Sequence, residues 1–192
     1  MTLTITAEIK NALWGCLEIP LYLKSGATRF SGSFAALKRS LVVPVLLIPV
    51  IMWAIPRPER YAGHSFIWEF LLMFIQLVVG TGFFAGILYF FKPRHVTTED
   101  FFKCITAYNW LSLSAFVVNI PLILLAVMGI NTWDDVLAMM ILVTLYSYSF
   151  LAFMITYTLR TSVFVGISFA LADLMLGEII RSLTTYFMLQ VL

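Results

Sequence analysis

The stretch that decides the fold of this chain runs from Phe66 to Phe91 and reads FIWEFLLMFIQLVVGTGFFAGILYFF. Glu69 is the one charged residue among these 26 residues. A helix of about 20 apolar residues crosses the roughly 30 Å of hydrocarbon in a bilayer. The stretch therefore predicts a membrane-spanning helix that is long enough to tilt or to emerge past the headgroups.

The composition of the whole chain predicts the same environment. Of its 192 residues, 61% are hydrophobic and 11% are charged, whereas a soluble domain is about half apolar and about a quarter charged. The aromatic content, with only 2 Cys, excludes disordered and disulfide-scaffold proteins. A net charge of +2 is too small for a nucleic-acid-binding surface. We therefore expect an all-α protein, a polytopic transmembrane helical bundle in contact with membrane lipid.

Four more stretches complete a prediction of five spans within residues 38–192. Three of them are long and apolar: Tyr108–Ile130, Val136–Leu159 and Ser162–Ile180. The other, Ser40–Ile55, has only 16 residues and contains Pro44 and Pro49. It can cross if Lys38 and Arg39 extend their charged ends to the interface and the bilayer adapts locally. Otherwise it forms a re-entrant hairpin.

The distribution of basic residues predicts how the chain is oriented. Five spans place nine of them on the side of the N-terminus: Lys10, Lys24, Arg29, Lys38, Arg39, Lys92, Arg94, Lys103 and Arg160. The other side receives three: Arg57, Arg60 and Arg181. Without a crossing at Ser40–Ile55, the division would be eight against four. Because basic residues accumulate in cytoplasmic loops, we expect five spans with the N-terminus cytoplasmic and the C-terminus outside. From the compact N-terminal segment we expect the membrane to be a bacterial inner membrane.

Residues 1–37 are expected to form a cytoplasmic segment at the membrane interface rather than a domain. Apolar residues recur there every four positions: Ile5, Ile9, Leu13 and Leu17. With Glu8 and Lys10 on the polar side, this pattern is typical of an interfacial amphipathic helix, which we expect to end near Pro20. Lys24–Ser33 is predicted to be a basic loop. The segment is either a membrane-lying anchor or an arm that binds a partner.

The last predicted span carries the densest group of polar residues. Asp173 lies about 17 Å from Ser162 at 1.5 Å per residue, near the membrane midplane. Glu178 is expected toward the outer interface and Arg181 at it. One helix face is small and polar and the opposite face is large and apolar: Ser162, Gly166, Ala170, Asp173, Gly177 and Arg181 on the first, Phe164, Val165, Met175, Leu176 and Ile179 on the second. Because small residues let helices approach closely in lipid, the small face should pack into the bundle.

Two interpretations of Asp173 remain open at the level of the sequence. In the first, Asp173 is the titrating group of a proton or cation relay, and Glu178 and Arg181 shape its mouth. In the second, Asp173 is a structural hydrogen-bonding group between helices, and Arg181 offsets Glu178. Residues on other spans that are candidates to line a polar site with it are Glu69, Gln76, Asn109 and Asn119, together with Ser112, Ser114 and the run Tyr146–Ser149.

Gly82 and Gly86 form a GxxxG pattern in the stretch quoted first. Glycine at this spacing permits close backbone approach between helices, where lipid gives no hydrophobic driving force. The pattern indicates either packing within the chain or a homodimer, so a homo-oligomer or a membrane-protein partner is an open prediction.

Sequence motifs of enzymes are absent from the chain. There is no HExxH, GxSxG, Walker-type glycine loop or dinucleotide-binding glycine pattern. His95 has no second His or Cys at a ligand spacing, and Cys16 and Cys104 form no CxxC. We expect no catalytic residues, no cofactor and no bound metal, and hence a protein that is not an enzyme.

Two stretches resemble a known family. These are TTEDFFKCITAYNWLSLSAFVVNIPLILL (residues 97–125) and YTLRTSVFVGISFALADLML (residues 157–176). Over roughly residues 34–185 the chain is similar to the bacterial form of the Yip-domain (Rab-interacting) membrane protein family. The resemblance implies a non-enzymatic interaction or membrane-organising factor. The chain lacks the DLYGP-type motif and the long N-terminal domain of the eukaryotic members, which argues against a role in vesicle traffic. The alternatives are a small transporter or channel subunit that uses Asp173, or an accessory subunit of a larger membrane complex.

Overall fold

The computed structural model describes residues 4–54 and 65–191, with side chains as far as residue 187. All regular structure in these ranges is helical, which confirms the predicted fold class. In chain order the helices are α1 (Ile5–Glu18), α2 (Lys24–Thr28), α3 (Phe34–Ser40), α4 (Val42–Ala54), α5 (Phe66–Phe91), α6 (Thr98–Val127), α7 (Trp133–Thr158) and α8 (Val163–Val191). Ile55, Arg57 and Arg60, which entered the span and charge predictions, lie outside the described residues.

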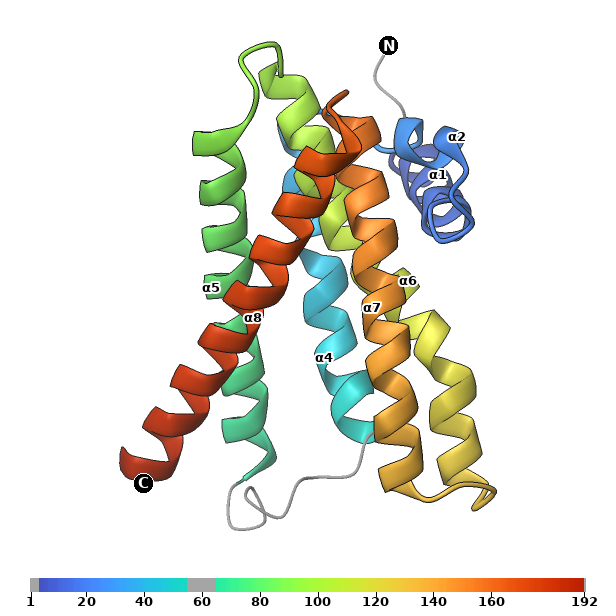
Figure 1. The fold of residues 1–192 in the computed structure, drawn as a ribbon, viewed down its shortest axis with the longest axis vertical. Coiled ribbons are helices and arrows are strands. Elements are labelled where there is room, and N and C mark those ends of the chain that lie inside the picture. Colours follow the sequence, from blue (N-terminus) through green and yellow to red (C-terminus); the bar gives the residue numbers. More distant parts are fainter. Residues whose placement is uncertain (1–3, 55–64, 192) are drawn as a thin grey trace.

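Five helices are long and apolar enough to cross a membrane. Four are α5, α6, α7 and α8 as far as Phe187, and the fifth combines α3 and α4 into the 21 residues Phe34–Ala54. Figure 1 shows α4 running to the end of the bundle that is opposite the N-terminus. The prediction of a short crossing is therefore confirmed, and the re-entrant alternative is wrong because α3 supplies the missing length. The protein is a multi-pass integral membrane protein.

Two of the long helices extend beyond their predicted spans. α6 begins at Thr98 because Thr97 caps it: its Oγ1 accepts a hydrogen bond from the backbone amide of Asp100 at 3.1 Å, and the Asp100 carboxylate accepts one from the Thr97 amide at 3.3 Å. The extension places Tyr108 inside a helix rather than at its start. α8 continues past Ile180 to Val191.

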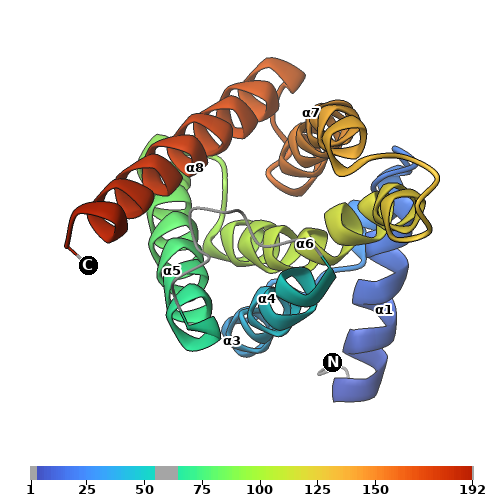
Figure 2. The same cartoon turned by 90° about the horizontal axis from the view of Figure 1, so that it is seen from below.

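The five spans form a ring. α4 packs against α5 and α6, α7 packs against α6 and α8, and α5 packs against α8. The order around the ring is therefore α4, α5, α8, α7 and α6 (Figure 2). α8 is tilted within this ring, so that it starts beside α7 and crosses toward α5 as it approaches the C-terminus (Figure 1). The first half of α8 therefore packs on α7, and the second half leaves it.

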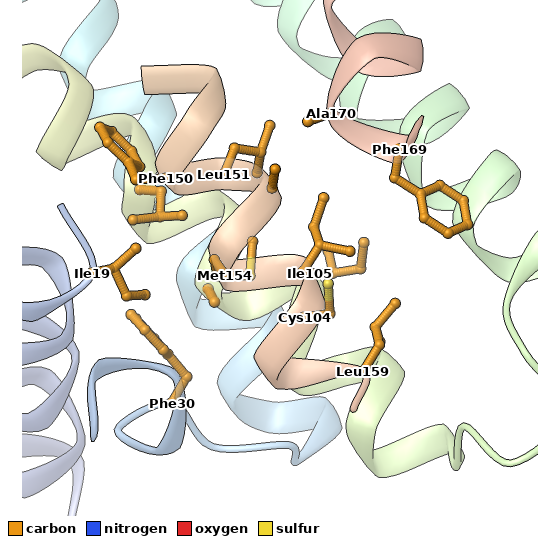
Figure 3. Close-up of a cluster of buried hydrophobic side chains, with 14 of the residues drawn as sticks. Ile19, Phe30, Cys104, Ile105, Phe150, Leu151, Met154, Leu159, Phe169 and Ala170 are labelled. Atoms are coloured by element: carbon orange, nitrogen blue, oxygen red, sulfur yellow. The ribbon is translucent and has the colours of Figure 1, made fainter. Parts of the chain in front are cut away.

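The tightest packing lies in the part of the bundle near the N-terminal segment. Met154 of α7 and Leu159, which directly follows α7, are fully buried. Figure 3 shows the cluster that they form with residues from other parts of the chain, including Ile19, Phe30 and Phe169. The outer surface is the opposite of a soluble protein's, because large apolar side chains cover it and several are more than four-fifths exposed: Trp53, Phe90 and Phe164. Such a surface suits a hydrocarbon solvent.

The N-terminal segment packs against α6 and α7 rather than lying apart from them (Figure 1). The hydroxyl of Ser114 donates to the Cys16 carbonyl at 2.8 Å, and the hydroxyl of Tyr146 donates to the Pro20 carbonyl. α1 turns small residues toward the bundle and leaves its four repeated apolar residues exposed, as an interfacial helix requires: Ile5, Ile9, Leu13 and Leu17. The predicted basic loop is partly wrong, because Lys24–Thr28 is the helix α2, which the Glu18–Arg29 ion pair (2.6 Å) joins to the end of α1.

Candidate functional site

Asp173 lies inside the bundle, about 15 Å along α8 from its first residue. The hydroxyl of Tyr108, from α6, donates a hydrogen bond to its Oδ1 at 2.9 Å. The Tyr108 ring stacks on Phe84 of α5, with 4.5 Å between the ring centroids, and this contact fixes the donor. Among the described residues, no basic side chain forms an ion pair with Asp173. The carboxyl group therefore has one neutral donor and further acceptor capacity.

Asp173 opens onto a cavity of about 290 Å³ at the centre of the ring, which we call the Asp173 cavity. All five spans contribute to its lining, from Pro44 of α4 to Asp173 of α8. Eight polar residues from α5, α6 and α7 line it: Thr81, Tyr108, Asn109, Ser112, Asn119, Thr144, Ser147 and Tyr148. The carboxyl group is thus not enclosed by apolar side chains but shares a polar cavity with groups from three other helices.

A second cavity, of about 240 Å³, lies on the other side of Asp173. Five of its lining residues also line the Asp173 cavity, so they form the wall between the two: Leu77, Thr81, Tyr108, Tyr148 and Asp173. Gln76 and Arg181 line only the second cavity. Asp173 therefore stands between two hollow regions that together extend along the inside of the bundle.

Glu178 and Arg181, which follow Asp173 on α8, lie in different environments. Arg181 lines the second cavity and donates to the exposed carboxylate of Glu178, three residues earlier on α8. Glu178 lines neither cavity. Arg181 thus lines the second cavity, whereas its ion-pair partner Glu178 lines neither cavity.

Of the ten polar residues predicted as candidates to accompany Asp173, six line at least one of the cavities: Gln76, Asn109, Ser112, Asn119, Ser147 and Tyr148. Asn109 and Asn119 line the Asp173 cavity, and Gln76 lines the second one, where its Nε2 donates to Thr184 Oγ1 at 2.6 Å. Glu69 is buried near the start of α5 and lines neither cavity. Its position two turns before Gln76 takes it toward the far end of the bundle.

Sequence reasoning missed Tyr108, which contacts Asp173 directly. The predicted span began at this residue, so it was taken as a span end, where tyrosine is common for interfacial reasons. The capping sequence at Thr97 was the signal that would have corrected this, because a helix that starts there carries Tyr108 about 15 Å inward.

The small face of α8 packs into the bundle only in its first half. A Cβ atom on Gly166 would lie 2.2 Å from Thr156 Oγ1 and 2.5 Å from the Ala152 carbonyl oxygen, and Ala170 is buried as well. A Cβ atom on Gly177 would meet nothing within 4 Å, and Ser162 is exposed. The prediction of packing is wrong for these two residues, because Ser162 precedes α8 and Gly177 lies where α8 has left α7.

The prediction that the large apolar residues of α8 share one face turned away from the bundle is partly wrong. Val165 and Leu176 are half-buried against the core, and Phe169 is buried. Phe164, Met175 and Ile179 are exposed, as predicted. The face of α8 that is buried in the bundle is therefore rotated relative to the face of small residues that was predicted to be buried.

Gly82 and Gly86 do not contribute to packing within the chain. A Cβ atom on either would meet nothing within 4 Å among the described residues. Both line an open apolar groove on α5, together with Phe83, Ile87, Phe90 and Phe91. The intramolecular interpretation of the GxxxG pattern is therefore wrong, and the intermolecular one stays a prediction.

Other reactive groups lie apart from the Asp173 cavity. Cys16 and Cys104 are both buried as free thiols, and burial raises the pKa of the Cys16 thiol to about 12. Within residues 4–54 and 65–187, no group of three or more His, Cys, Asp and Glu side chains is placed to hold a metal ion. The chemistry that the described residues offer at the site is a carboxyl group with neutral donors and acceptors around it.

No protein-family model, no curated protein and no solved structure matches the chain. Arguments about its function therefore rest on the geometry around Asp173, and the Yip-domain resemblance stays a prediction.

Proposed function

We propose that this protein is a small transporter that binds a cation at Asp173 and moves it across the membrane. The observation that carries the proposal is the position of the carboxyl group between two cavities. A carboxyl group that only joins two helices needs a donor and close packing around it. The Tyr108 hydroxyl supplies the donor, but Asp173 borders two cavities instead of closely packed side chains. Because an ionised group inside a membrane costs several kcal/mol when unpaired, an acidic residue in such a position is by default functional.

The polar wall around Asp173 supports a path for a cation rather than an anion. Tyr108, Tyr148 and Thr81 offer hydroxyl oxygens to both cavities without adding positive charge. The one guanidinium group at the second cavity, from Arg181, is paired with Glu178, which offsets its charge. A cation that passes Asp173 can exchange water for these oxygens one after another.

The direct test is flux through the full chain reconstituted into liposomes, for protons, sodium and potassium, with Asp173→Asn. The amide keeps the acceptor for Tyr108 and removes the charge, so folding should survive and cation flux should fall by about tenfold or more. Asp134→Asn is the matched control, because it makes the same exchange at an exposed carboxylate that lines neither cavity, and it should leave flux within about twofold. Equal flux in wild type and Asp173→Asn, or no flux of any cation in the wild type, contradicts the proposal.

The same proposal includes the orientation and membrane predicted from the sequence. The excess of basic residues at the N-terminal end supports a cytoplasmic N-terminus in a bacterial inner membrane.

A second candidate is an interaction factor of the Yip-like kind or a subunit of a larger membrane complex. The outward groove at Gly82 and Gly86 favours it, because small residues there let another helix approach closely. The double substitution Gly82→Ile and Gly86→Ile should leave folding intact and abolish a crosslinked oligomer or complex in native membranes. An unchanged crosslink contradicts this candidate.

A further inference from the structure

A third hollow, almost wholly apolar, adjoins the Asp173 cavity. It is a cleft of about 390 Å³ between α4 and α5, which we call the α4–α5 cleft. Pro44, Leu77 and Thr81 line both the cleft and the Asp173 cavity. The remaining lining is hydrocarbon or aromatic, and most of it is exposed on the lipid-facing side of the bundle: Leu41, Val42, Val45, Phe74 and Val78. A charged cavity and an apolar cleft open to lipid thus share a wall.

One of the residues that line the Asp173 cavity, Asn109, also has a buried acceptor without a donor. The Nδ2 of Asn109 donates to Ser40 Oγ at 2.9 Å, and that hydroxyl in turn donates to the Leu37 carbonyl at 2.8 Å. Because the Ser40 proton is used, the amide cannot be turned round to receive it. The Asn109 Oδ1 is then buried without a hydrogen-bond partner among the described residues, although Asn109 is only 1% exposed. A buried acceptor without a donor is costly, and a ligand with N–H groups would satisfy it.

The lining of the Asp173 cavity suits an organic cation better than a metal ion. A hard metal ion takes about six or more oxygen ligands, whereas much of this lining is apolar or aromatic, as at Leu77, Leu111 and Phe150. Ligand sites for organic molecules are mostly apolar with a few placed polar groups. Tyr148 also lines the cavity, and aromatic rings attract ammonium groups.

Resting on the function proposed above, we propose that the transported cation is a protonated amine with an apolar tail. Its ammonium group lies in the Asp173 cavity, where Asp173 and the Asn109 Oδ1 accept its hydrogen bonds. Its tail lies in the α4–α5 cleft, which it reaches past Leu77 and Thr81.

The test uses the full chain in lipid nanodiscs and a series of n-alkylammonium ions from methylammonium to hexylammonium, with binding measured by titration calorimetry. Subtracting the heats measured with Asp173→Asn from those of the wild type removes the contribution of alkylammonium ions that partition into the lipid. The remaining affinity should rise about fourfold for each methylene of the tail that leaves water. Hexanol, which has the tail without the charge, should show no Asp173-dependent binding, and hexyltrimethylammonium, which has no N–H, should bind about tenfold more weakly than hexylammonium.

Two tryptophan variants locate the tail. Val78→Trp fills the cleft from a position that is 53% exposed, and it should abolish the rise of affinity with tail length while leaving methylammonium unaffected. Ile75→Trp, at a 49% exposed position outside the cleft on the same helix, should leave the whole series unchanged. An equal loss in both variants would overturn the placement of the tail.

The outcomes separate the two proposals. If Asp173-dependent flux of protons, sodium or potassium is present but alkylammonium affinity does not change with tail length, the substrate class is wrong and the transporter stands. If no cation in either set shows Asp173-dependent binding or flux, both proposals are wrong.

Discussion

The hydroxyl of Tyr108, on α6, contacts the carboxyl group of Asp173, on α8. The tyrosine ring is held from behind by Phe84, so its position does not depend on the hydrogen bond. The hydroxyl can therefore be removed without removing the ring, which separates the chemistry of the pair from its packing.

Tyr108→Phe should weaken cation binding or transport while the protein still folds. A hydrogen bond to a charged group contributes roughly 1.5 to 3 kcal/mol, so we expect a loss of about tenfold or more. The measurement is the cation concentration that gives half-maximal flux in liposomes, together with the thermal midpoint of unfolding. Tyr148→Phe is the matched control, because Tyr148 lines the same two cavities and no hydrogen bond joins it to Asp173 within the described residues. An equal effect of both variants would assign the loss to general polarity rather than to the Tyr108 contact.

Cys16 reports whether the N-terminal segment is packed on the bundle. Burial raises its pKa to about 12, whereas a free thiol in water titrates near about 8.5. The packed state holds the thiol protonated, so the packing is fully favourable below about pH 8.5 and weakens as the pH rises toward about 12. At pH 8.5, alkylation of Cys16 by N-ethylmaleimide should therefore be at least about tenfold slower than in the unfolded protein.

A variant that loosens the segment gives the control for this prediction. Tyr146→Phe removes the donor to the Pro20 carbonyl and should accelerate alkylation of Cys16. Mass spectrometry of the peptides distinguishes Cys16 from Cys104, which is buried in the bundle and should stay slow in both proteins. Fast alkylation of Cys16 in the wild type would mean that the segment is not packed as described.

At the scale of the helices, the tilt of α8 explains which of its glycines matter. Gly166 lies where α8 contacts α7, so that the backbone of Ala152 and the hydroxyl of Thr156 fill the space a side chain would need. Gly177 lies beyond that crossing and faces open space. The two residues are alike in sequence context and opposite in environment.

Gly166→Ala should destabilise the protein by about 1 to 3 kcal/mol, because a methyl group forces the helices apart. Gly177→Ala should be neutral or slightly stabilising, since alanine is the better helix former by up to about 1 kcal/mol. Both are measured as the thermal midpoint of the purified protein in one detergent. A loss at Gly177 as large as at Gly166 would show that the second half of α8 also packs closely.

Much of the fold was predictable because hydropathy reports the environment of a helix in lipid. The stretch Phe66–Phe91 is α5 to the residue, and Val136–Leu159 is close to α7. The tilt of α8 was not predictable, because angular position on a helical wheel says which residues share a face but not how far along the helix a neighbour follows that face. Hence Gly166 was placed correctly and Gly177 was not.

The acidic residue of the site was predictable from the sequence, but the residues that surround it were less so. An acidic residue near the middle of a span draws attention by its cost alone, which singled out Asp173. Tyr108 carries no such signal, because tyrosine is common at span ends and its hydroxyl is tolerated there. Facing residues on different helices depend on rotations and crossings that one sequence does not encode directly. Glu69 was therefore included although it lines neither cavity, and Tyr108 was left out.

At the scale of the whole molecule, the two ends of the bundle differ in charge. The N-terminal segment, the α5–α6 connection and the α7–α8 connection lie at one end, and they carry most of the basic residues of the chain (Figure 1). At the opposite end, the first turn of α7 carries Asp134 and Asp135, and the α6–α7 connection before it has no Lys or Arg. The chain begins near one end and finishes at the other, as five crossings require.

This asymmetry predicts where a reporter fused behind Leu192 will lie. Because basic residues are retained in the cytoplasm, the end with α1 should be cytoplasmic and the C-terminus outside. Alkaline phosphatase, which is active only outside the cytoplasm, should therefore be active when fused there, and a green fluorescent protein should stay dark. Fusions within the connection between α7 and α8, beside Arg160, should give the reverse pattern. A fluorescent C-terminal fusion would invert the bundle, so that the second cavity, which Arg181 lines, would face the cytoplasm and the proposed cation would meet Asp173 from the opposite side.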